Sequence, residues 1–241
     1  MLLAFVAFGC RSCETIDSSK LDPSEIYQEY SVAVADNTSV RAEFRVSGST
    51  GTTIALVAPT TILHNGRSMN EHLRTVLSGT FYSAETDGFT GSHTFIFTDS
   101  SGRQYKNSLN FEPVKIASQN LDLSKSSKTI SIPLTRGLAD GESITALLTS
   151  DTAPPKQATN TGNSNASPSA GPEYSASLTG SVDNDARTFS ISTDQLRNFV
   201  NGKAKLYITI SGSRKPSDVG IRGGSISYSI QSPTATANVA N

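Results

Sequence analysis

Residues 93–111 read HTFIFTDSSGRQYKNSLNF, and this stretch decides the fold class. Its apolar residues fall at alternate positions on either side of a turn at Ser100–Gly102, namely Phe95, Phe97, Tyr105, Leu109 and Phe111. Alternation with a period of two around a turn predicts a β-hairpin with one buried and one solvated face. Aromatic residues that pair across such a hairpin add about 0.2–1 kcal/mol each.

The same alternation recurs along most of the chain. Val32–Val34 and Val40–Val46 flank Asp36-Asn37 and predict a second hairpin. Further strands are expected at 53–58, 61–64, 79–84, 129–134, 143–149, 174–181, 187–191, 204–210 and 226–230. Helical spacing is limited to 68–77 and 192–202. The pattern predicts an all-β chain of two immunoglobulin-like β-sandwich domains with at most one short helix in each, and a single larger sandwich is the alternative.

The alternation relaxes around residues 112–126, which places the domain boundary there. We therefore expect an N-terminal β-sandwich at 26–113 and a C-terminal β-sandwich at 114–231. Residues 151–172 contain no apolar side chain larger than alanine apart from prolines, and they predict a flexible loop because nothing in them offsets the entropy of ordering. Residues 232–241 are expected to form a disordered tail.

Composition excludes two classes of protein. The chain has 20 basic and 21 acidic residues and a net charge of −1, so it lacks the concentrated positive charge of a nucleic-acid-binding protein. Its two cysteines, Cys10 and Cys13, both lie near the N-terminus, so the folded body has no disulfide framework.

The first ten residues predict export. Leu2–Gly9 is uninterrupted apolar sequence that would span about 12 Å as a helix, against the roughly 30 Å of a bilayer core, and it fits a signal segment at 1–10. The stretch Val6-Ala7-Phe8-Gly9-Cys10 resembles a bacterial lipobox, which implies that Cys10 carries a lipid and that the chain's partner at this end is the membrane. Residues 11–25 then read as a polar tether. A buried N-terminal strand with an incidental cysteine is the alternative.

No catalytic or metal-binding pattern emerges from the sequence. His64, His72 and His93 stand at no common metal spacing and are expected to be exposed and incidental. No nucleophile elbow is present, and the paired acids Asp183 and Asp185 are expected to belong to a turn. We therefore expect no catalytic residue, no metal and no cofactor, and predict that the protein is not an enzyme.

Two surface features suggest a bound ligand or a covalent modification. Arg214, Lys215 and Arg222 gather in one loop and suggest an anion contact, although a solvated hairpin loop is the favoured interpretation. Asp151-Thr152-Ala153 resembles the O-glycosylation signal that Bacteroidota use on exported proteins, with Thr152 as the acceptor.

Taken together, the lipobox-like residues and the strand patterning of 25–231 resemble small secreted lipoproteins of Bacteroidota-like bacteria that carry tandem immunoglobulin-like domains. The resemblance implies a non-catalytic protein of the cell envelope, anchored in the outer membrane by lipid, that binds a protein or glycan partner or acts as a scaffold. The alternatives are a fimbrillin-like pilus or adhesion subunit and a carbohydrate-active or carbohydrate-binding protein.

The anchor is testable directly. In cells fed a clickable palmitate, we expect the wild-type chain to be labelled and the Cys10→Ala variant to lose the label, because the cysteine thiol carries the lipid. Label that persists in Cys10→Ala, or that is absent from both chains, would contradict the anchor.

Overall fold

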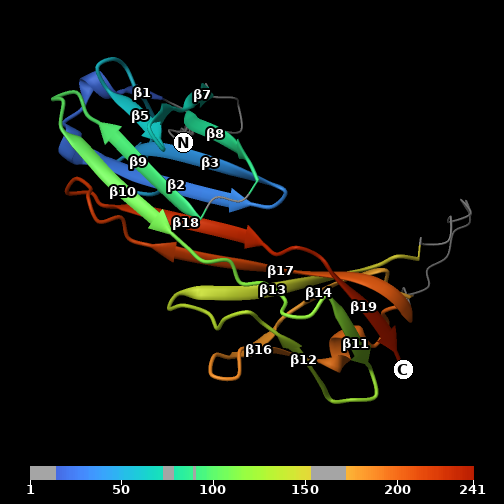
Figure 1. The fold of residues 1–241 in the computed structure, drawn as a ribbon. Helices are drawn as coiled ribbons and strands as arrows, with labels where there is room; N and C mark the ends of the chain where they lie inside the picture. Colours follow the sequence, from blue (N-terminus) through green and yellow to red (C-terminus); the bar gives the residue numbers. More distant parts are fainter. Residues whose placement is uncertain (1–14, 73–78, 89–90, 153–171) are drawn as a thin grey trace, which may run out of the picture. The chain divides into compact units, whose positions relative to one another are not determined.

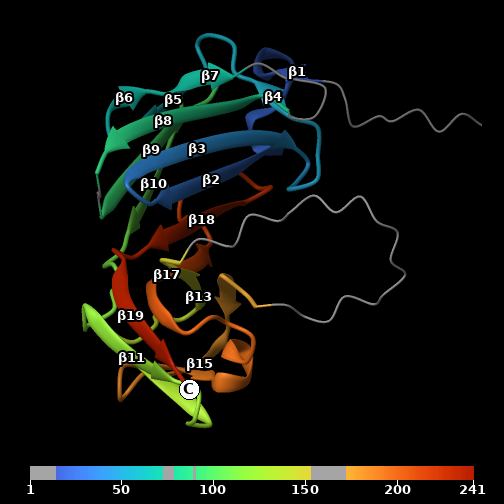
Figure 2. The same ribbon diagram turned by 90° about the vertical axis from the view of Figure 1, so that its right-hand side faces the viewer.

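The computed structural model describes residues 15–72, 79–88, 91–152 and 172–241. Within them the chain forms β-strands and three short 3-10 turns, which confirms the all-β prediction. The chain divides into two compact units, shown in Figures 1 and 2. Unit 1 contains the residues up to Glu112 together with 213–228, and unit 2 contains 113–212 and 229–241.

Unit 1 is a sandwich of two sheets with a short parallel strand pair beside them. One sheet has the order β18-β2-β3-β8-β7, formed by Gly224–Gln231, Ile26–Val34, Asn37–Val46, Phe81–Asp87 and Asn70–His72. The other has the order β10-β9-β5-β6, formed by Gln104–Asn110, Ser92–Thr98, Thr61–His64 and Arg67–Ser68. The parallel pair consists of β1 (Ile16–Asp17) and β4 (Ile54–Ala55).

The strand order of unit 1 is that of an immunoglobulin domain. The run β2-β3-β8-β7 corresponds to the A-B-E-D sheet of a constant-type domain, and β10-β9-β5 corresponds to its G-F-C sheet. Both predicted hairpins are present, as β2–β3 and β9–β10. Strand β18 has no counterpart in that scheme and extends the first sheet beyond β2.

Stacked aromatic rings join the two sheets of unit 1. Tyr30 of β2 lies on Phe95 of β9 with 4.4 Å between ring centroids, and Phe44 of β3 lies on Phe97 of β9 at 4.5 Å. Each of these four side chains is fully buried. Aromatic pairs of this kind are worth about 0.5–1.5 kcal/mol beyond the area that they bury, so they fix which faces of the sheets meet.

Unit 2 is a second sandwich. One sheet contains β14, β13, β17, β19 and β11 as successive neighbours, at Ser175–Leu178, Glu142–Ser150, Gly202–Arg214, Ala235–Ala240 and Asn120–Ser124. The other has the order β12-β16-β15, at Thr129–Pro133, Thr188–Ser192 and Gly180–Asp183. These orders correspond to the C′-C-F-G and B-E-D sheets of an immunoglobulin domain, with β11 added in parallel beside β19. The core between them is aliphatic apart from Phe189 and Phe199.

The expected C-terminal domain at 114–231 is wrong in one respect, because residues 213–228 belong to unit 1. The strand prediction for 226–230 was correct, but alternation along one strand does not say which sheet accepts it. Strand β18 lies beside β2, and its Tyr228 stacks on Phe111 with 5.6 Å between ring centroids.

The predicted polar tether at 11–25 is also wrong from Ile16 onward. β1 pairs with β4, and 3-10 turns follow at Ser18–Lys20 and Pro23–Glu25. The buried Ser18 hydroxyl donates to Thr60 Oγ1 at 3.2 Å and accepts from the Val57 backbone N–H at 2.9 Å. The polar residues of this segment are thus packing partners of a neighbouring loop.

The tail predicted at 232–241 instead forms β19. Ala235, Ala237 and Val239 alternate with polar residues and are buried, and the strand pairs with β17 on one side and β11 on the other. Small side chains made this alternation easy to miss, because alanine contributes little to an apolar pattern.

Neither predicted helix is present in the described residues. Segment 192–202 contains one 3-10 turn at Thr193–Leu196. Beyond the turn, the Val200 N–H donates to the carbonyl of Glu173 and not to a carbonyl within the segment, so no helix continues there. Segment 68–77 contributes part of β6 and all of β7, and its residues 73–77 lie outside the described residues. The predicted signal segment 1–10 and most of the loop at 151–172 also lie outside them.

Strand β19 supplies the next prediction. Deletion of residues 232–241 should unfold unit 2, because it removes four buried side chains, those of Ser232, Ala235, Ala237 and Val239, and leaves β11 and β17 without a shared partner. Hydrogen exchange followed by mass spectrometry should show loss of amide protection in both strands. Deletion of Asn241 alone, which lies beyond β19, is the control; unchanged protection in the longer deletion would contradict the role of the strand.

Candidate functional site

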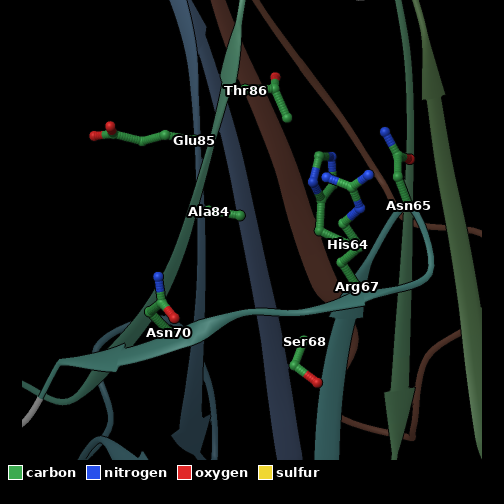
Figure 3. Close-up of a pocket in the computed structure, with 8 residues that line it drawn as sticks. All are labelled: His64, Asn65, Arg67, Ser68, Asn70, Ala84, Glu85 and Thr86. Carbon is green, nitrogen blue, oxygen red and sulfur yellow. The ribbon is translucent and has the colours of Figure 1, made fainter.

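A pocket of about 390 Å³ lies in unit 1, where the two sheets separate at their edge. Its lining comes from the turn after β5 and from β6, β7 and β8, and consists of His64, Asn65, Arg67, Ser68, Asn70, Ala84, Glu85 and Thr86. Figure 3 shows Ala84 and Thr86 facing the pocket from β8, whereas Glu85 points to the other side of that strand. This difference follows from the alternation of side chains along a strand.

The turn at one side of the pocket is held by its own side chain. Asn65 and Gly66 both have positive φ, at 48° and 77°, which suits the two-residue turn between β5 and β6. Asn65 Oδ1 accepts from the Thr94 N–H at 2.8 Å, and its Nδ2 donates to the Ser92 carbonyl at 3.3 Å. The amide of Asn65 is therefore committed to structure.

One lining residue of the pocket, His64, is buried and lies beside a second buried histidine, His93. His64 is 3% exposed and His93 is fully buried, and His64 Nε2 lies 3.0 Å from His93 Nδ1. Burial, with a smaller contribution from His93, lowers the pKa of His64 to about 4. His64 is therefore neutral at pH 7, and one imidazole donates a hydrogen bond to the other. The expectation that both side chains are exposed was wrong, whereas His72 is exposed as expected.

Several polar groups at the pocket are uncommitted. Thr86 Oγ1 is buried without a hydrogen-bond partner in the described part of the chain. Arg67, Ser68 and Asn70 are exposed, and no contact with another described residue occupies their side-chain donors and acceptors. A buried hydroxyl without a partner costs free energy, and a bound ligand or water can recover that cost. The pocket thus combines a neutral floor with free donors and acceptors at its rim.

A second polar group of side chains lies on β2, β3 and β8, and its charges balance, although Arg45 Nε has no hydrogen-bond partner among the described residues. Glu43 is largely buried between Arg41 and Arg45, which both bond to its carboxylate. Arg45 also lies 3.5 Å from Glu29, and the Arg41 guanidinium covers the Phe81 ring at 4.0 Å. Two acids thus balance two bases, and the network leaves no net charge for a ligand.

Two of the three loop cations have partners within the described residues. The Arg222 guanidinium donates to Glu25 at 2.7 Å, and Arg214 lies over the Tyr228 ring at 5.8 Å. Lys215 is exposed. Thr152 is exposed as well, and its backbone N–H donates to Ser150 Oγ at 3.0 Å. Cys10 lies outside the described residues.

Three buried acids are each occupied by structural partners. Asp99 accepts from the hydroxyl and the backbone N–H of Ser101 and from the backbone N–H of Arg103. Burial raises its pKa, and these hydrogen bonds, the Ser101 hydroxyl first, outweigh burial and lower it. Glu142 pairs with Arg136 at 2.8 Å, and Glu43 belongs to the arginine network described above. Among the eight residues that line the pocket, Glu85 is the single acid.

No group of three or more His, Cys, Asp or Glu side chains among residues 15–72, 79–88, 91–152 and 172–241 could hold a metal ion. Over the same residues, no helix has the length and apolar character needed to cross a membrane.

No family model matches the chain, and no curated protein matches it. Among solved structures, SGBP-B from the mixed-linkage glucan utilization locus of Bacteroides ovatus, in complex with a mixed-linkage heptasaccharide, is 8% identical and covers 86% of this chain at a TM-score of 0.21. The adhesin InvE of Yersinia pseudotuberculosis is 10% identical and covers 87% at a TM-score of 0.21. The matched regions span 53% and 59% of those two proteins. These similarities assign neither a family nor a ligand.

The burial of His64 and His93 could have been predicted from the alternation of residues along their strands. His93 stands in the alternation with Phe95 and Phe97, and His64 stands two residues after Ile62, so both fall on inward faces. Thr86 shares its face of β8 with Tyr82 in the same way. The two-residue period of the strands therefore indicates that these side chains point inward, although polar residues of these types are usually exposed.

The buried histidine predicts a dependence of stability on pH. Because the pKa of His64 is about 4 in the folded chain and 6.5 ordinarily, the unfolded chain binds an extra proton between these values. The contribution of neutral His64 to the free energy of unfolding is complete above about pH 6.5. It is lost as the pH falls towards 4, at up to about 1.4 kcal/mol per pH unit. Between about pH 7 and about pH 5, the wild type should lose about 2 kcal/mol more than His64→Gln in urea unfolding. His72→Gln should keep the wild-type dependence; an equal loss in His64→Gln would contradict this assignment.

Proposed function

We propose that this chain is a lipid-anchored, non-catalytic binding protein of the bacterial cell envelope, and that the pocket beside His64 and Thr86 receives its ligand. The observation that carries the proposal is the set of uncommitted polar groups around that pocket, with the buried Thr86 hydroxyl unpartnered among the described residues. Asn65, which also lines the pocket, and Asp99, elsewhere in unit 1, are bonded to the chain itself. Arg45 Nε is the other buried side-chain atom without a hydrogen-bond partner among the described residues.

The chemistry of the pocket favours a neutral, hydroxyl-rich ligand, of which a glycan is the envelope's commonest example. The floor is neutral because His64 is uncharged at pH 7. The amide of Asn70 and the hydroxyls of Ser68 and Thr86 can both donate and accept, as sugar hydroxyls do. Arg67 adds a planar donor that can bond two adjacent oxygens.

The lipid at Cys10 would hold unit 1 close to the membrane. Ile16 is six residues beyond Cys10 and already pairs with Ile54, so the free linker is at most about 20 Å long. A polar tether of fifteen residues, as first expected, would have allowed a much longer reach. The shorter link suits a receptor for ligands at the membrane surface.

The two alternatives fit the described residues less well. A fimbrillin-like pilus or adhesion subunit would assemble by adding an exchangeable strand, but the C-terminal strand β19 is paired on both sides within unit 2. A glycosidase would direct two carboxylates into one cleft, about 5–9.5 Å apart, whereas Glu85 is the one acid at this pocket and points away from it.

A glycan array followed by calorimetry tests the proposal. We expect at least one glycan to bind the wild type, and Arg67→Ala or Asn70→Ala to weaken that binding about tenfold, because each removes a hydrogen bond to the ligand. Glu85→Gln is the matched control, since its side chain leaves the pocket in Figure 3, and it should bind as the wild type does. Binding that is unchanged in both pocket variants would place the ligand elsewhere, and absence of binding across the array would contradict a glycan ligand.

A further inference from the structure

Residues 213–228 are separated by 100 residues from the rest of unit 1, yet they complete it. They are flanked in sequence by 113–212 and 229–241, which form unit 2. Both views show β18 beside β2, with the two arrows pointing the same way (Figures 1 and 2). Unit 1 thus consists of a continuous piece, up to Glu112, and a strand-bearing segment that arrives much later in the chain.

The segment fits closely against β2. The Gln28 N–H donates to the Gly223 carbonyl at 3.2 Å, and a side chain at Gly224 would bring its Cβ within 2.4 Å of the Gln28 carbonyl oxygen. Glycine is therefore required at position 224. Beyond it, Ile226 and Tyr228 are 2% and 3% exposed and fill the interior of unit 1.

The same segment is also fixed to β10, in the opposite sheet. The Asp218 N–H donates to Asn107 Oδ1 at 2.9 Å, and Asn107 Nδ2 donates to the Asp218 carbonyl at 2.7 Å. In addition, the Lys106 N–H donates to the Asp218 carboxylate at 2.9 Å. The side-chain amide of Asn107 is fully buried and bonds to Asp218 as the backbone of a neighbouring strand would. Its N–H group donates to Asp218 and its oxygen accepts from Asp218.

Glu25 adds an ion pair with Arg222 at 2.7 Å. Residues 15–112 therefore present a receiving edge, made by β2 and β10 with Glu25, that is specific for the hydrogen bonds, the glycine and the buried side chains of 213–228. An edge strand left bare would expose unpaired backbone groups, so this edge needs its partner segment.

We propose that this receiving edge also accepts residues 213–228 of a second copy, so that two chains exchange the segment and form a strand-swapped dimer. Residues 15–112 connect to unit 2 through a single passage of the chain, between Glu112 and Pro113. Lys115 and Ala117 are already bonded to Thr135 and Pro133 of unit 2, which leaves a very short hinge. The contacts are the same within one chain and between two, and short hinges favour exchange between copies.

The test uses two full-length chains that carry different affinity tags. Refolding them together from denaturant at high protein concentration should give a dimer that co-purifies on either tag and has twice the monomer mass by light scattering. Mixing the native chains at the same concentration should give none, because exchange requires unit 1 to open. Absence of a co-purifying dimer after refolding would overturn the proposal.

Two variants distinguish exchange from other association. Gly224→Val blocks the donated segment, and Asn107→Leu removes the amide that receives Asp218. Refolded together, the two variants should pair, because Gly224→Val still offers an intact receiving edge and Asn107→Leu an intact segment. Two copies of Gly224→Val should not pair. If they associate as well as the wild type does, the dimer uses another surface and the proposal is wrong.

An independent control uses the wild-type segment and edge. Insertion of about fifteen Gly and Ser residues between Glu112 and Pro113 lengthens the hinge and makes closure within one chain more competitive with exchange, so it should lower the dimer yield several-fold. An unchanged or higher yield would contradict the role of the short hinge. This experiment is independent of glycan binding, since neither the hinge nor the segment lines the pocket.

Discussion

The stacking of Tyr30 on Phe95 and of Phe44 on Phe97 is the contact on which unit 1 depends. The four rings come from three strands in two sheets, so they set the spacing between the sheets and the register in which the sheets face each other. Towards β6 and β7 the facing positions carry His64, whose ring lies 5.4 Å from that of Phe95, and the smaller side chains of Ala84 and Thr86. These small side chains on β8 leave part of the same spacing unfilled at the pocket.

Side-chain amides substitute for strand backbone in both units, at the buried Asn107 in unit 1 and at the exposed Asn184 and half-buried Gln195 in unit 2. Asn107 bonds both groups of Asp218, Asn184 bonds both groups of Leu138, and Gln195 bonds both groups of Thr179. Each pair fastens a loop to the sandwich by two hydrogen bonds of ordinary strand type. These amides secure connections that no regular strand pairing could reach.

The sequence predicted strands well and their partners poorly. Alternation located the hairpins at 26–46 and 92–110, because inward and outward residues differ sharply there. It missed β19, where the inward residues are mostly alanine, and it could not place β18, because β2 is almost two hundred residues away in the sequence. The predictions of a tether after Ile16 and of a helix at 192–202 were wrong for a related reason. The polar residues of both segments bond to loops that are distant in the sequence. The candidate pocket was missed because residue type was given more weight than strand position at His64 and His93.

The contrast between Thr86 and Asn107 explains why the pocket and the receiving edge call for different ligands. Asn107 is buried with its amide fully satisfied, so removal of the partner segment would leave two buried polar atoms without bonds. Thr86 leaves its hydroxyl unbonded within the described residues while the sandwich stays intact, so a ligand there adds a contact that folding does not need. The first arrangement suits a partner that is part of the protein itself, whether from the same chain or from a second copy. The second suits a molecule that comes and goes.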